Sequence, residues 1–65
     1  MTVTELLQKI KSNLKEKRLE IAESLVQGRV SDFASYSKNV GIAEGLDQSI
    51  GIIDETLNKI NEEDE

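Results

Sequence analysis

The sequence predicts an all-α fold, an antiparallel hairpin of two helices in a single domain of 65 residues. Apolar residues recur three and four positions apart along both halves of the chain, as they do on one face of a helix. Signals that end one helix and begin another meet once, between residues 28 and 32. Proline is absent, and the alternating β-branched and aromatic residues that predict strands are missing.

The first helix is expected over about residues 3–27. The segment TVTE fits a capping box, in which Thr2 accepts a hydrogen bond from the first turn and Glu5 reaches back to the cap. At the other end Gly28 suits the left-handed conformation that follows a helix, so the turn is expected over about 28–31. The apolar face consists of Val3, Leu7, Ile10, Leu14, Ile21 and Leu25.

The second helix is expected over about residues 32–61, with Ser31 or Asp32 as its N-cap. Residues 62–65 are all acidic and would lie at the negative end of the helix dipole, so we expect a loose acidic tail. The apolar face of this helix consists of Phe33, Tyr36, Val40, Ala43, Leu46, Ile50, Ile53, Leu57 and Ile60.

The short connection predicts that the two helices pack as antiparallel neighbours. Folding the chain near residue 30 pairs positions whose numbers add to about 60, and apolar residues then face apolar residues at every step but one. The exception is Lys17, which falls opposite residues 43–45. The hairpin core is expected to contain Leu7, Ile10, Leu14, Ile21, Leu25, Phe33, Tyr36, Val40, Ile50, Ile53 and Leu57.

Small residues form a row four positions apart in the second helix, although each interior glycine weakens a helix by roughly 1 kcal/mol. Such a row makes a shallow groove that lets another backbone approach closely. Three interpretations remain open: the groove receives the first helix under the methylene stem of Lys17, it receives another chain, or the helix breaks there. The row and its border contain Ser37, Gly41, Gly45, Ser49, Ile42 and Leu46.

The composition argues against several classes of function. Cysteine and histidine are absent, so we expect no metal, no cofactor and no catalytic site, and carboxylates at helical spacing indicate a solvated face. The net charge of −5 disfavours nucleic acid and anionic membranes, and no apolar run is long enough to span a membrane. No small-molecule substrate is indicated. The N-terminus does not resemble a signal peptide, which predicts an intracellular location.

A protein partner is the remaining expectation, because two helices this short supply little core. Dimerisation or docking on a larger assembly would complete a helical bundle and cover the apolar residues beside the seam. Two alternatives stay open: an acidic regulator that binds a host protein through residues 29–65, and nucleic-acid binding through the basic segment 9–18. The apolar residues beside the seam are Leu6, Leu19, Val26, Ile42 and Ile52.

The stretch LVQGRVSDFASYSKNVGIAEGLDQSI, residues 25–50, resembles small helical-hairpin proteins encoded by tailed bacteriophages. This resemblance implies a minor virion component or assembly factor, located in the host cytoplasm or the virion, and it assigns no active residue. The matching positions are Gly28, Ser31, Asp32, Phe33, Tyr36, Gly41, Gly45 and Leu46.

Overall fold

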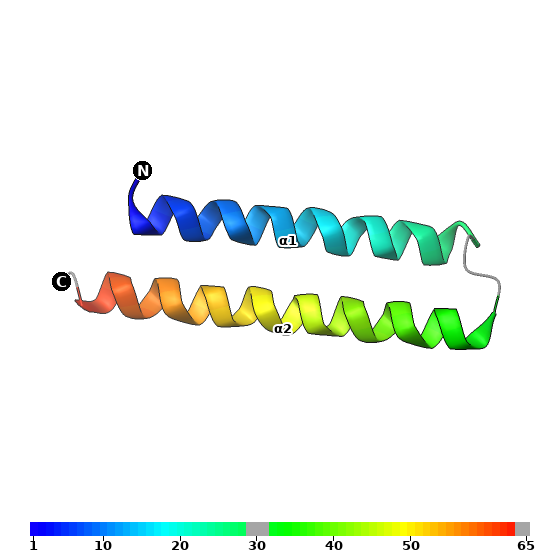
Figure 1. Ribbon diagram of the computed structural model, residues 1–65. Helices are drawn as coiled ribbons and strands as arrows, with labels where there is room; N and C mark the ends of the chain where they lie inside the picture. The colour runs from blue at the N-terminus through cyan, green and yellow to red at the C-terminus, as the bar shows by residue number, and fades with distance from the viewer. Residues whose placement is uncertain (29–31, 64–65) are drawn as a thin grey trace.

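The computed structural model describes residues 1–28 and 32–63, which form two long helices lying side by side (Figure 1). Helix α1 spans Val3–Val26 and helix α2 spans Phe33–Glu63. They run in opposite directions, so the start of α1 and the end of α2 lie at the same end of the molecule (Figure 1). The predicted antiparallel hairpin is therefore confirmed, as a narrow rod of 50 × 18 × 13 Å.

The first helix begins at the cap that the sequence predicts. Thr2 has extended backbone angles, and its hydroxyl accepts a hydrogen bond from the backbone N–H of Glu5 at 3.1 Å. This is the Thr2 half of the expected capping box. The return bond from the Glu5 side chain is not among the hydrogen bonds of the described residues.

The first helix ends at Val26, one residue before the predicted end, and Gly28 follows it in the expected left-handed conformation. Gly28 has a φ of +70°, which only glycine adopts without steric strain. Its N–H donates to the Leu25 carbonyl at 3.3 Å, and the N–H of Gln27 donates to Glu23 at 2.9 Å. These bonds satisfy carbonyls that the end of a helix leaves without partners. Ser31, one of the two predicted caps of the second helix, lies outside the described residues.

Asp32 is the N-cap of α2. Its Oδ1 accepts from the backbone N–H of Ser35 at 2.8 Å, and its Oδ2 accepts from the Ser35 hydroxyl at 2.9 Å. The backbone bond, and after it the hydroxyl bond, lowers the pKa of Asp32 because both stabilise the carboxylate. The ionised cap therefore favours the folded state.

We expect this cap to make stability depend on pH in the acid range. Because the folded pKa lies below the unfolded value, the contribution is complete above the usual aspartate pKa of about 3.9 and disappears as pH falls through the folded pKa. Asp32→Asn keeps a capping oxygen without a titrating group. Thermal unfolding of the two proteins at pH 7 and pH 2 should show a larger loss of stability in the wild type. An equal loss in both proteins would contradict the prediction.

The helices meet along a seam of apolar residues that are three, four or seven positions apart. Ile21 and Leu57 are its most buried members, with 9% and 8% of their surface exposed. The other seam residues are half-buried, which confirms most of the predicted core. These are Leu7, Leu14, Leu25, Val40, Ala43, Leu46, Ile50, Ile53 and Ile60.

Three residues predicted for the core lie outside it. Phe33 and Tyr36 are 82% and 50% exposed, because the first turn of α2 lies beside the end of α1, where few side chains remain to cover it. Ile10 is 41% exposed, because it precedes the seam residue Leu14 by a full turn and so borders the seam. Val3, which belongs to the apolar face predicted for the first helix, is 65% exposed and also borders the seam.

Two ion pairs join the helices along one side of the seam. Lys11 Nζ lies 2.5 Å from Asp54 Oδ1, and Arg18 Nε donates to Asp47 Oδ1 at 2.5 Å. The hydrogen bond to Asp47, and after it the charge attraction, raises the pKa of Arg18. The two basic residues are seven positions apart on α1, and the two aspartates are seven positions apart on α2. The ion pairs therefore repeat at two turns of each helix. Such pairs favour one register more than they add stability.

Lys17 does not cover the glycine row, contrary to one interpretation of the sequence. Its side chain is exposed and lies 3.6 Å from Glu20 on its own helix. The position facing α2 belongs instead to Arg18, one residue later, which the 100° step between residues turns toward the seam.

Candidate protein-docking face

The glycine row of α2 is open rather than filled. The helix is unbroken from Phe33 to Glu63, so the interpretation in which the helix breaks at the row is wrong. A Cβ added at Gly41 or Gly45 would meet nothing within 4 Å, so the interpretation in which α1 fills the groove is also wrong. Of the three interpretations of this row, only contact with another chain remains, and the structure of a single chain does not test it.

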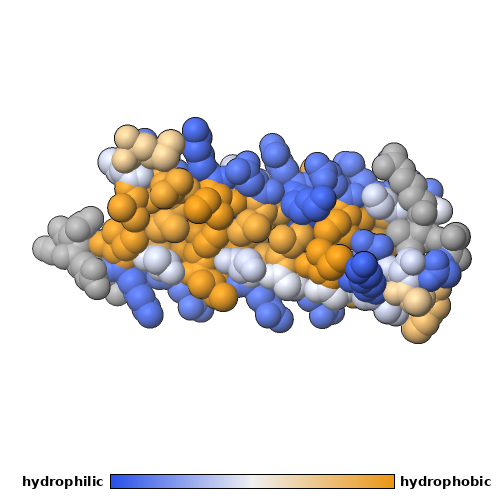
Figure 2. Space-filling model, in the orientation of Figure 1, coloured by the Kyte–Doolittle hydropathy of each residue, from blue (hydrophilic) through white to orange (hydrophobic). Residues whose placement is uncertain are grey.

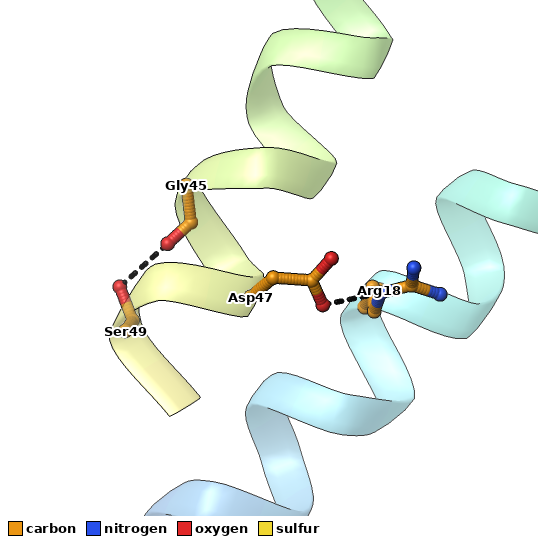
Figure 3. Close-up of polar contacts among 4 residues, drawn as sticks. All are labelled: Arg18, Gly45, Asp47 and Ser49. Carbon is orange, nitrogen blue, oxygen red and sulfur yellow. Dashed lines mark hydrogen bonds and ion pairs between the residues drawn. The ribbon is translucent and has the colours of Figure 1, made fainter. Parts of the chain in front are cut away.

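The direction of the row explains why α1 does not reach it. A step of four residues turns a helix by about 40° more than a full circle, so the row slants around α2. Figure 3 shows the result: Asp47 points toward Arg18 on α1, whereas Gly45 and Ser49 lie on the other side of α2. Ser37 and Gly41 lie still further from the seam, and both are exposed.

The two ion pairs reveal which exposed residues share a side of the hairpin. Lys11 follows the seam residue Leu7 by four positions and contacts Asp54, which follows Ile50 by four. The polar residues that follow Leu7, Leu14, Ala43 and Ile50 by four therefore lie together on one side. Residues that precede seam positions by four lie together on the opposite side, as Ile10 and Ile42 do.

We call this opposite side the open face. In the view of Figure 2, hydrophobic surface runs along both helices between two borders of polar side chains. Its apolar members are substantially exposed, and small or hydroxyl residues lie between those of α2. The open face consists of Val3, Leu6 and Ile10 from α1 and Ile42, Gly45, Ser49, Ile52 and Thr56 from α2.

The polar groups on the α2 part of this face are already satisfied within the helix. Ser49 Oγ donates to the Gly45 carbonyl at 2.8 Å, and Thr56 Oγ1 donates to the Ile52 carbonyl at 2.9 Å. A buried hydroxyl costs free energy only when it lacks a hydrogen bond. A partner can therefore cover these side chains without leaving a donor unpaired.

A second group of exposed apolar residues lies at the turn end of the rod. Leu19, Val26, Phe33 and Tyr36 are each at least half exposed. Val26 and Phe33 lie nearest to residues 29–31, which the structure does not describe, so these exposed residues support no separate site.

Other classes of function would use a pocket, a metal-binding group, free basic side chains or a membrane-spanning helix. Within residues 1–28 and 32–63 there is no pocket and no cluster of side chains that could hold a metal ion. Three of the five basic side chains of segment 9–18, namely Lys11, Lys17 and Arg18, lie in ion pairs within the chain. Neither α1 nor α2 is long and apolar enough to cross a membrane.

The open face was only partly visible in the sequence. Leu6, Ile42 and Ile52 were expected beside the seam, but periodicity alone did not place them together or add Val3 and Ile10 to them. The signal that could have done so is a matched spacing of charges: Lys11 and Arg18 are seven apart on the first helix, as are Asp47 and Asp54 on the second. Pairing these charges would have shown which side of the seam is polar. Comparison with protein-family models, curated proteins and solved structures gave no match to this chain.

Proposed function

We propose that this protein is a protein–protein interaction module, which acts by docking rather than by catalysis, and that the open face is its contact surface. The observation that carries the proposal is an apolar face along both helices with no covering side chains. Monomeric soluble proteins rarely leave an extended apolar patch uncovered unless it binds something. The resemblance of residues 25–50 to phage proteins extends the proposal to a minor virion or assembly component.

The other two candidate functions have less support. A charge-driven regulator would act through the carboxylates of residues 29–65, and two of these, Asp47 and Asp54, are already paired with basic residues of α1. Nucleic-acid binding would need free basic side chains, and Lys11 and Arg18 serve those same pairs. Both candidates also predict binding that weakens steeply with salt, whereas apolar docking does not.

A photo-crosslinking amino acid placed on the open face tests the proposal. We expect a crosslinker at Ile52 to capture protein in the cells that make this chain, because a docked surface would lie against it. The matched control is the same crosslinker at Asn58, which is exposed on the far side of α2. Equal capture at the two positions, or no capture at either, would contradict the proposal.

A further inference from the structure

We infer that the open face binds a second copy of this chain, with α2 packed antiparallel against α2 of the partner around a two-fold axis that crosses the open face midway between Gly45 and Ser49. This inference rests on the proposed function, since it names the occupant of the same face. It is argued from the uncovered area, from the order of residues along α2 and from the charges that border the face.

The chain exposes more surface than a compact monomer of its mass would, by about the area that one partner buries in a dimer. The chain exposes 5037 Å², whereas a compact monomer of 7.3 kDa exposes about 4,200 Å². The excess, roughly 800 Å², is similar to the area that each partner buries in a standard interface, also about 800 Å². The radius of gyration, 15.1 Å, likewise exceeds the ~11 Å expected of a compact chain of this length.

The open face of α2 is self-complementary. Ile42 and Ile52 are equally far from residue 47, and so are Gly45 and Ser49, because the numbers in each pair add to 94. In an antiparallel two-fold contact, Ile42 therefore meets Ile52 of the partner subunit, and Gly45 meets Ser49 of the partner subunit. This reciprocity is what a two-fold interface requires.

The small residues then lie where the two helices cross. Gly45 has no side chain, and the Ser49 hydroxyl is turned back to the Gly45 carbonyl of its own helix (Figure 3). A Cβ at Gly45 would meet nothing within the chain, which leaves the space that a close helix crossing needs. The isoleucines on either side provide the apolar contact that flanks the crossing.

The charges at the border of the face are complementary in the same arrangement. Lys38 lies one turn before Ile42, and Glu55 lies about one turn after Ile52. Their numbers add to 93, so Lys38 lies level with Glu55 of the partner subunit, and the contact occurs twice. Within the described part of the chain, neither side chain has an ion-pair partner.

Exchanging these charges tests the inference by sedimentation across a range of concentrations at low ionic strength. The wild type is expected to dimerise. Lys38→Glu and Glu55→Lys should each weaken their own dimer about tenfold, because both contacts become repulsive. A mixture of the two variants should form a heterodimer nearly as tight as the wild-type dimer. Lys9→Glu and Glu44→Lys are matched controls away from the open face, and circular dichroism checks that every variant stays helical.

Two results would overturn the inference. One is a wild type that remains monomeric at all concentrations; capture by the Ile52 crosslinker would then show separately whether the face binds a different protein. The other is a wild-type dimer that the charge exchanges change no more than their controls do, which would mean that α2 does not pack on α2 in this way.

Discussion

Leu57→Ala is expected to unfold most of the hairpin. Leu57 has the least exposed side chain named in the seam, at 8%, and removing a buried leucine side chain costs about 2–5 kcal/mol. A helical pair this small obtains only about 3–5 kcal/mol from its core. The loss is therefore comparable to the whole stability of the fold, and circular dichroism at 25 °C should show a large decrease in helicity.

The matched control for this variant is Leu19→Ala, which makes the same exchange on an exposed residue of α1. Leu19 is 57% exposed, so its truncation should change the free energy of unfolding by no more than about 0.5 kcal/mol. If Leu57→Ala unfolded at the same urea concentration as Leu19→Ala, the seam would not be the structural core of the protein.

Gly45→Leu is expected to prevent association while it stabilises the single hairpin. Leucine favours a helix over glycine by about 1 kcal/mol, and the new side chain meets no neighbour within the chain. The same side chain fills the space that a docked helix would occupy. Sedimentation should show a monomer, and thermal unfolding at low protein concentration should occur at a higher temperature than in the wild type.

Gly51→Leu is the matched control, because Gly51 is also an exposed helical glycine but lies off the open face. It should stabilise the helix equally and leave association intact. The open space beside both glycines leaves room for a leucine side chain within the single hairpin. If Gly45→Leu unfolded the hairpin, the description of that space would be wrong; if it associated like Gly51→Leu, the row would not be a contact surface.

These two variants separate the two roles of α2. One side of the helix builds the fold through Leu57 and the other seam residues. Another side carries a row of small residues that costs helix stability without improving the packing against α1. Close approach by another chain, as proposed for the open face, would explain why the helix keeps glycine at Gly45.

Much of the fold could be predicted from the sequence because its signals are local. The cap at Thr2, the cap at Asp32 and the left-handed turn at Gly28 each depend on the chemistry of one short segment. Periodicity located the seam for the same reason: residues on one face of a helix keep a fixed spacing whatever the partner is. The bounds of both helices were accordingly correct within two residues.

The sequence by itself determined that the chain forms two helices, where they end and which apolar stripe each carries. Only the tertiary structure decided which edge of each wide stripe faces the other helix. That choice left Ile10 outside the core, put Arg18 rather than Lys17 against α2, and turned Gly41 and Gly45 away from α1. The physical reason is that a helix of 3.6 residues per turn presents several neighbouring faces of similar hydrophobicity, and the contacts between helices select among them.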